Sequence, residues 1–328
     1  MSFPNSFTPL IAKAKKCINE LLFSLKSLSH FDFNLFMKLF DAKVFPILSY
    51  GCELWGLADN IDIERVHLYA MKRFLNVSLH TSNNKIYSET GRYPVSITHK
   101  IRCVKYWLKV RQYEQSRLVR QSILCLDNMC SLGHENWVSK IRDTLCSNGY
   151  GIVWIYGQVG CKELFLKQLK QTLIDNFLQG WNEKMAHDSN CSWFYGFKQV
   201  IEREVYLNNF HIKLSLRNVL AKFRLGVSQI HCHRYKFSLF DDYRICPFCV
   251  RRYYEDEHHV LFVCPLYTTI RNEYLSNIIS KFDNIVNDKF QFQTFIQEHQ
   301  YVIAKYLLKM FVIRNEIVKS RTSDNLFV

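Results

Sequence analysis

Residues Arg244 to Tyr267 read R-I-C-P-F-C-V-R-R-Y-Y-E-D-E-H-H-V-L-F-V-C-P-L-Y, and this stretch carries the clearest structural signal in the chain. It has the form Cys-x2-Cys-x9-His-x4-Cys, with four candidate ligands: Cys246, Cys249, His259 and Cys264. Zn²⁺ prefers four thiolate or imidazole ligands at the corners of a tetrahedron, and a Cys-x2-Cys pair supplies two of them from one tight turn. Four protein ligands leave no open coordination position, so the spacing predicts a structural Zn²⁺ cofactor in a small zinc-knuckle domain.

The sequence leaves part of this ligand set open. His258 and His259 are adjacent, and the x4 spacing to Cys264 favours His259 over His258 at x5. The run H-C-H at residues 231–233 could supply a ligand instead, although its separation from Cys246 is typical of a loop rather than of a zinc motif. The four residues could also be unrelated members of a chain that holds twelve cysteines.

The size and composition of the chain indicate a folded protein with real cores. It has 328 residues, of which 48% are hydrophobic and 15% aromatic. No apolar run reaches the roughly 18 residues that a membrane span needs, and the N-terminus lacks the layout of a signal peptide. The cysteines are scattered along the chain and do not show the spacing of a disulfide framework, which fits a reducing compartment. We therefore expect a nuclear or cytoplasmic protein that is not secreted and has no membrane partner.

Apolar residues recur at helical spacing along most of the chain, which predicts a mostly α-helical fold. Helices are expected near residues 8–25, 32–45, 64–77, 96–110, 136–145, 162–181, 270–282 and 290–318. The polar run from Ala186 to Cys191 is the clearest linker. We expect three segments, residues 1–95, 96–190 and 191–328, with the knuckle (246–264) in the last.

The positive charge is clustered, which points to a polyanionic partner. The net charge is +14, and residues 100–120 hold seven basic residues against one acid. Lys105 and Lys109 belong to this predicted phosphate track. Residues 198–252 carry a net charge of +7 with aromatic residues interleaved, a pattern typical of single-stranded nucleic-acid binding. The alternative is that the rings belong to a core and the charges only keep the protein soluble.

Several short blocks resemble the region that follows the catalytic palm in reverse transcriptases of LINE-type (non-LTR) retrotransposons. The blocks are F-P-I-L-S-Y-G-C-E-L-W-G (45–56), the expected helix 64–77 ending in R-F-L-N-V, Y-S-E-T-G-R-Y-P (87–94), K-Q-V-I-E-R-E-V-Y-L (198–207), L-R-N-V-L-A-K-F-R-L (216–225) and the knuckle with its C-P-L-Y ending. Together they span most of residues 9–280. The Y-G-x-E-x-W-G block and the knuckle are the specific ones.

The resemblance implies a function as well as a fold. Residues 1–95 would be the end of the palm and a thumb-like helical remnant, residues 96–190 a helical connector, and residues 191–328 a domain that grips template RNA or target DNA for the rest of a reverse transcriptase. It implies the same four zinc ligands and a set of phosphate contacts near them: Arg224, Arg234, Lys236, Arg244, Arg251 and Arg252. The chain departs from the family pattern at the Arg251-Arg252 pair and at the doubled histidine.

No catalytic machinery is expected in this chain. DNA synthesis needs a carboxylate set that holds two Mg²⁺ ions, including a [Y/F]-x-D-D hairpin. The single Asp-Asp pair, Asp241-Asp242, follows S-L-F and lacks the [Y/F]-x-D-D pattern. We expect it to form a turn that leads into the knuckle. Fingers and palm are missing upstream, and no Pro-Asp nuclease signature follows Cys264.

We therefore expect a non-catalytic fragment that binds RNA or single-stranded DNA, with a structural zinc. The sequence leaves three alternatives open: a binding module retained by the host, a zinc-stabilised structural or protein-interaction domain, and a non-functional retrotransposon remnant.

Overall fold

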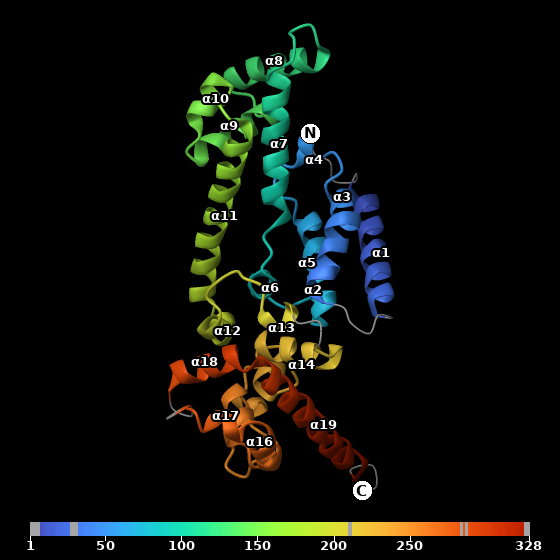
Figure 1. Ribbon diagram of the computed structural model, residues 1–328, viewed down its shortest axis with the longest axis vertical. Coiled ribbons are helices and arrows are strands. Elements are labelled where there is room, and N and C mark those ends of the chain that lie inside the picture. The colour runs from blue at the N-terminus through green and yellow to red at the C-terminus, as the bar shows by residue number, and fades with distance from the viewer. Residues whose placement is uncertain (1–6, 27–31, 209–211, 283–284, 286–287, 325–328) are drawn as a thin grey trace. The chain divides into compact units, whose positions relative to one another are not determined.

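The computed structural model describes residues 7–26, 32–208, 212–282, 285 and 288–324. Helices form nearly all of the regular structure in these residues (Figure 1), and their only β pairing is one antiparallel bridge between Ile245 and Tyr254. The prediction of a mostly α-helical fold is confirmed. None of the helices in the described ranges combines the length and the apolar character that a bilayer crossing requires.

The elements follow one another with short connections. The first part of the chain contains α1 (Phe7–Lys26), α2 (Phe33–Leu39), the π-helix η1 (Phe40–Val44), α3 (Phe45–Leu48), α4 (Cys52–Trp55), α5 (Ile61–Leu75), α6 (Asn83–Thr90), α7 (Val95–Arg111), α8 (Leu118–Ser131), α9 (Trp137–Ser147), α10 (Gly151–Tyr156) and α11 (Lys162–His187). It continues with η2 (Ser189–Cys191), α12 (Ser192–Phe197), α13 (Val205–Asn208), α14 (Leu214–Arg224), α15 (His231–Arg234), η3 (Asp241–Arg244), η4 (His259–Val263), η5 (Pro265–Tyr267), α16 (Thr268–Tyr274), α17 (Ser276–Ile279), α18 (Lys289–Glu298) and α19 (Gln300–Asp324).

The chain forms two compact units, whereas the sequence predicted three consecutive segments. Unit 1 contains the described parts of Met1–Ser27, Leu35–Ala70 and Arg92–Lys184, and unit 2 those of Leu28–Asn34, Met71–Gly91 and Met185–Val328. The units divide between Gly91 and Arg92 and between Lys184 and Met185, a few residues before the predicted boundaries at 95/96 and 190/191. Residues 71–91 belong instead with the C-terminal part of the chain.

The Y-G-x-E-x-W-G block has a packing role in unit 1. Gly51 has a φ of 65°, in the left-handed region that favours glycine, and it caps the start of α4. A Cβ on Gly56 would lie 2.6 Å from the carbonyl oxygen of Cys52 and 2.7 Å from Cβ of His99 on α7. Gly56 therefore lets α4 approach α7 closely, and Cys103 of α7 donates its thiol hydrogen to the Cys52 carbonyl at 3.1 Å.

The polar groups in this packing are paired. His99 is buried, and its Nε2 lies 3.0 Å from the Ser49 hydroxyl. Burial, reinforced by the nearby Arg102 guanidinium, lowers the pKa of His99 to about 4, so its ring is neutral at physiological pH. The carbonyl of Glu53 accepts a hydrogen bond from Trp137 Nε1 at 3.0 Å, which ties α9 to the same block.

Unit 2 is built around α19, which packs against α14 and α16 (Figure 1). Its interior contains ionisable groups from distant parts of the sequence. Arg224 is fully buried, with its Nε 2.7 Å from Glu89 and its Nη2 3.0 Å from Glu204. Lys198 reaches Glu204 at 2.7 Å. Such a network stabilises the fold only while every member is paired, because an unpaired buried charge is costly.

Candidate metal centre and cationic surface

The four predicted ligands of the knuckle come together in unit 2. One ligand atom each from Cys246, Cys249, His259 and Cys264 lies within 4.8 Å of all the others. The Sγ atoms of Cys246 and Cys264 are 3.9 Å apart, those of Cys249 and Cys264 are 3.7 Å apart, and Cys249 Sγ lies 3.3 Å from His259 Nε2. Cys246, His259 and Cys264 are buried. This Cys₃His cluster could hold a metal ion.

The first two ligands are positioned by a short hairpin-like turn. The Ile245–Tyr254 bridge closes it, with the amide of Cys246 donating to the Tyr253 carbonyl at 2.8 Å. The amide of Glu255 donates to the carbonyl of Arg244, also at 2.8 Å. This pairing fixes the start and the end of the loop, so that both thiols of the Cys-x2-Cys turn point to the same side.

The other two ligands are positioned by the π-helix η4. An i→i+5 hydrogen bond joins the amide of Cys264 to the carbonyl of His259 at 2.8 Å, which brings these two residues into adjacent positions. An ordinary α-helical turn would rotate residues five apart onto different faces. Asp256 Oδ1 accepts a hydrogen bond from the His259 amide at 2.7 Å and fixes the entry into η4. The four residues between His259 and Cys264 in the sequence therefore form a π-turn that places the two ligands side by side.

Side chains from two other helices hold the cluster in unit 2. Arg271 of α16 donates to the carbonyls of Leu261 and Cys264, both at 2.7 Å. Arg314 of α19 forms a buried ion pair with Glu255, which also accepts a hydrogen bond from the His231 amide at 2.8 Å. Sequence reasoning missed both arginines, because nothing in their local spacing connects them to the knuckle.

The thiols of the cluster interact strongly with one another. A hydrogen bond from the Cys264 thiol lowers the pKa of Cys246 to about 4, against the opposing effect of burial. The same shared proton, together with burial, raises the pKa of Cys264. The cluster thus favours a thiolate at Cys246, which is the form that binds metals.

The alternative ligands have other partners. The ring of His258 packs in an aromatic group with Phe262 and Phe292, at centroid distances of 5.3 and 5.7 Å. His231 Nδ1 lies 2.8 Å from the carbonyl of Ile245. His233 lies between the Ser228 hydroxyl and the Glu257 carboxylate, at 2.7 and 2.5 Å. The structure thus includes His259 in the cluster and places these three histidines outside it.

Two of the predicted phosphate contacts point into the protein. The prediction is wrong for Arg224, because this side chain is fully buried and paired with Glu89 and Glu204. Arg244 is half-buried and directs its donors at the carbonyls of Tyr235, Lys236 and Ser238 and at Asp241. Both arginines hold the fold together.

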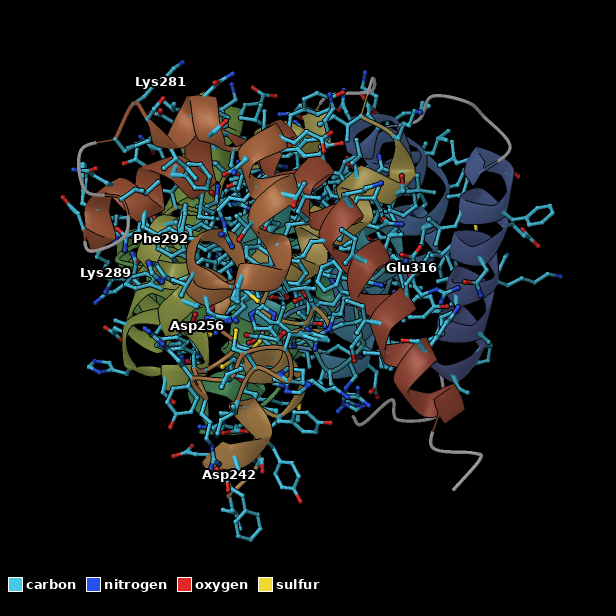
Figure 2. All side chains as sticks on the ribbon, turned by 90° about the horizontal axis from the view of Figure 1, so that it is seen from below. Asp242, Asp256, Lys281, Lys289, Phe292 and Glu316 are labelled. Carbon is cyan, nitrogen blue, oxygen red and sulfur yellow. The ribbon has the colours of Figure 1, made fainter. Side chains whose placement is uncertain are left out.

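The remaining basic residues near the knuckle lie at its surface. Arg234, Arg251 and Arg252 are exposed, and Lys236 is half-buried. Arg252 has a φ of 50° and pairs with Asp242 at 2.7 Å, where both side chains are largely exposed. Exposed rings surround them on the loop between α15 and η4: Phe237, Phe240, Tyr243, Tyr253 and Tyr254. Figure 2 shows Asp242 at the outer end of this loop, with aromatic side chains beside it. We call residues 234–254 the cationic loop.

The predicted phosphate track of unit 1 is only partly free. Lys105 and Lys109 are exposed on α7 and form no ion pair with any other described residue. Lys100 instead pairs with Asp59 at 2.9 Å, and Arg111 with Asp127 at 3.4 Å. Asp59 lies between α4 and α5 and Asp127 lies on α8, so the local sequence count of seven bases against one acid overstated the free charge.

No protein family, no curated protein and no solved structure matches this chain.

Proposed function

We propose that this chain is a zinc-stabilised, non-catalytic module that binds single-stranded nucleic acid. The observation that carries the proposal is the Cys₃His cluster, whose four ligand atoms lie within 4.8 Å of one another at the base of the cationic loop. A metal there would fix the conformation of a segment that otherwise has one β bridge and two short turns of helix. Small motifs of this kind depend on the metal for their folding.

The donor set and its spacing favour zinc. Three thiolates and one imidazole form a soft set that suits Zn²⁺, whereas Mg²⁺ and Ca²⁺ take oxygen ligands. Zn–S bonds of about 2.3 Å in a regular tetrahedron give an S···S separation of about 3.8 Å. Two of the S···S distances in the cluster are 3.7 and 3.9 Å. Four protein ligands fill the tetrahedron, so the proposed ion is structural rather than catalytic.

The cationic loop supplies the groups that an unpaired strand needs. Arg234, Arg251 and Arg252 are positioned to neutralise phosphates, and exposed rings offer faces on which bases stack. Aromatic side chains that are this exposed contribute little to a core, which supports a binding role for them. Lys105 and Lys109 would add a second, independent set of phosphate contacts in unit 1.

The resemblance to the post-palm region of LINE-type reverse transcriptases supplies a context for this binding. In that context the module grips template RNA or target DNA, and its protein partner is the rest of a reverse transcriptase. This part of the proposal depends on the quoted sequence blocks alone.

Removing the charge of Arg251 and Arg252 tests the binding role. The double variant Arg251→Gln/Arg252→Gln keeps a side chain on the left-handed backbone of Arg252, so the turn is conserved. We expect affinity for a 12-nucleotide RNA to fall about three- to thirtyfold, and the slope of log Kd against log salt to fall by about 1. Fluorescence anisotropy over 50–300 mM KCl measures both quantities.

The matched control is Lys167→Gln/Lys170→Gln, which removes two exposed charges from α11 in unit 1. The control should reproduce the wild-type slope. Equal losses in both variants would mean that net charge alone drives the binding. A wild-type chain whose affinity is absent or independent of salt would contradict the nucleic-acid proposal.

A protein-interaction role is the second candidate, and two side chains of the cationic loop favour it. Leu239 is 95% exposed and Val250 is 100% exposed. Apolar side chains exposed on the same loop are a feature of protein-binding surfaces. The same salt series separates the two roles, because apolar docking depends little on salt.

A further inference from the structure

A groove in unit 2 lies beside the knuckle and shares Arg234 and Pro247 with the cationic loop. It consists of two adjoining cavities of about 800 and about 490 Å³. They share one wall: Val227, Ser228, Gln229 and Asn315. The larger cavity extends past α15 to Pro247 in the Cys-x2-Cys turn, and the smaller one extends along α14 to Asn76 and Ser78. Cavities of this size hold a nucleotide-sized ligand.

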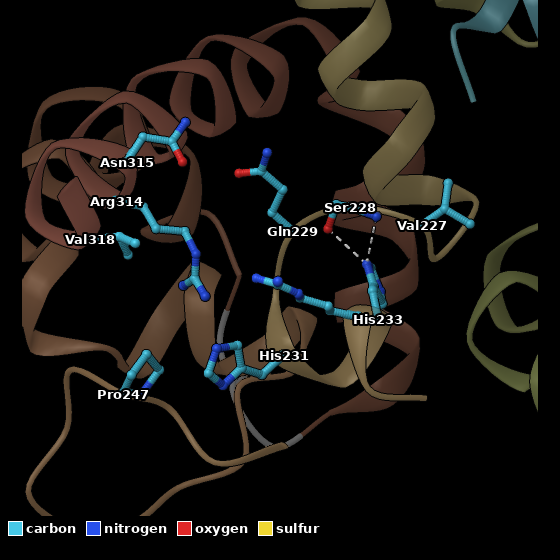
Figure 3. A pocket seen from close by; sticks show the side chains of 10 residues that line it. Val227, Ser228, Gln229, His231, His233, Pro247, Arg314, Asn315 and Val318 are labelled. Atoms are coloured by element: carbon cyan, nitrogen blue, oxygen red, sulfur yellow. Dashed lines mark hydrogen bonds between the residues drawn. The ribbon is translucent and has the colours of Figure 1, made fainter. Parts of the chain in front are cut away.

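Side-chain amides line this groove without protein partners. Gln229 and Asn315 are exposed, and neither side chain makes a hydrogen bond to the described part of the chain. Figure 3 shows their amide groups on facing sides of the larger cavity. In the smaller cavity Asn218 has a buried Oδ1 that also lacks a partner. Buried polar atoms are nearly always paired, so an unpaired amide oxygen in a cavity wall indicates a missing ligand group or water.

The charge of the groove favours an anionic ligand. Arg234 and Lys222 line its two ends, and no aspartate or glutamate is among the described residues that line either cavity. Val227, Pro247 and Val318 supply an apolar wall in the larger cavity. The groove therefore combines an apolar surface, amides that donate and accept hydrogen bonds, and the cations Arg234 and Lys222; Glu255 and Glu257 do not line it but pair with the lining residues Arg314 and His233.

We propose that this groove receives one or two unpaired bases of a bound single strand and distinguishes them through Gln229 and Asn315. A side-chain amide presents a donor and an acceptor side by side, which matches the paired donor and acceptor on the edge of a base. The apolar wall packs against the base, and Arg234 contacts the adjacent phosphate. The inference rests on the proposed nucleic-acid function and adds base preference to the sequence-independent contacts of Arg251 and Arg252.

The test compares base preference in the wild-type chain and in a groove variant. The probes are labelled 12-nucleotide homopolymers of A, C and U as RNA and their DNA counterparts, measured with the zinc-loaded full chain. The variant Gln229→Met/Asn315→Leu keeps the side-chain sizes and removes the amides. We expect the wild type to prefer one base, and the variant to lose about tenfold or more in affinity for that base, with an unchanged salt slope. Comparing the RNA and DNA series shows whether the chain prefers strands with ribose or with deoxyribose.

A control and a second measurement sharpen the interpretation. Gln121→Met/Asn128→Leu, at two exposed positions on α8 in unit 1, should keep the wild-type preference. Photocrosslinking of a 5-iodouridine oligonucleotide to the wild-type chain should label peptides around residues 227–234 and 311–318. This readout does not depend on how the variant folds.

The outcomes separate the inference from the function on which it rests. If the wild type binds oligonucleotides but the groove variant keeps both affinity and preference, or if crosslinks fall only on residues 237–244 and 250–254, the groove inference is overturned and the function stands. Competition by polyglutamate as effective as that by RNA would also overturn it, in favour of an acidic peptide ligand. If the wild type binds no oligonucleotide, the proposed function fails, and the inference fails with it.

Discussion

Replacing Cys249 with serine is expected to abolish zinc binding and to unfold the knuckle locally. The zinc content of the purified chain should fall from about one equivalent to near zero. Residues 244–267 should lose protection from hydrogen exchange, because the apparent binding free energy of a structural zinc, about 10–16 kcal/mol, is largely folding free energy of the motif. Without the ion, Arg271 and Arg314 still hold the ends of this segment, but the ligand side chains join the Cys-x2-Cys turn at the Ile245–Tyr254 bridge to the π-turn at His259–Val263 only through weak thiol hydrogen bonds. Metal analysis with hydrogen-exchange mass spectrometry measures both effects.

Cys232→Ser is the matched control for this variant. Cys232 is a half-buried thiol on α15, close to the knuckle in the chain but outside the Cys₃His cluster. It should keep one equivalent of zinc and wild-type protection. A Cys249→Ser chain that retained a full equivalent of zinc would contradict the proposed ligand set. Loss of zinc from Cys232→Ser would indicate that residues 231–233 supply a ligand.

The second large effect is expected from Arg224→Met, which removes the positive centre of the buried network in unit 2. The change removes the cation paired with Glu89 and leaves Glu204 with Lys198 and the amides of Gln297 and Gln300. Removing one member of a buried ion pair costs about 3–5 kcal/mol, mostly because a charge stays buried without compensation. The loss should be seen as faster hydrogen exchange in α14 and α19. Arg203→Met, at an exposed arginine of the same unit, should change exchange little.

The pH dependence of the Arg224→Met variant identifies the cause of its loss of stability. Burial already raises the pKa of Glu89, and Arg224 opposes that rise, so removing the arginine raises the pKa further. A carboxyl group with a raised pKa in the folded state stabilises the fold at low pH and loses that contribution as pH rises. The stability deficit relative to the wild type should therefore shrink between pH 7.5 and 5. Glu89→Gln added to Arg224→Met should recover part of the deficit at pH 7.5, and a deficit independent of pH and of Glu89→Gln would show that packing, not charge, is responsible.

The features that sequence could predict are those set by local spacing. Helical periodicity predicted the α-helical class. The Cys-x2-Cys and His-x4-Cys spacings predicted the cluster, because each pair of ligands is positioned by a single turn of the chain. The x4 spacing also favoured His259 over His258, and the ring of His258 instead packs against Phe262.

The features that sequence could not predict depend on residues far apart in the chain. Arg224 looks like a surface base next to a knuckle, yet its main partner Glu89 lies 135 positions away. Lys100 and Arg111 look free in the sequence, but Asp59 from the α4–α5 connection and Asp127 from α8 pair with them. The grouping of residues 71–91 with the C-terminal unit has the same origin. A cluster of charge in a sequence predicts a cationic surface only where the fold brings no acids to it.

X-ray absorption at the zinc K-edge of the purified chain tests the central claim most directly. The Cys₃His assignment predicts one zinc per chain with three sulfur neighbours at about 2.3 Å and one nitrogen at about 2.0–2.1 Å. The spectrum should be unchanged in Cys232→Ser. A shell dominated by oxygen, a sulfur count of two or fewer, or a chain that acquires no zinc would contradict the account.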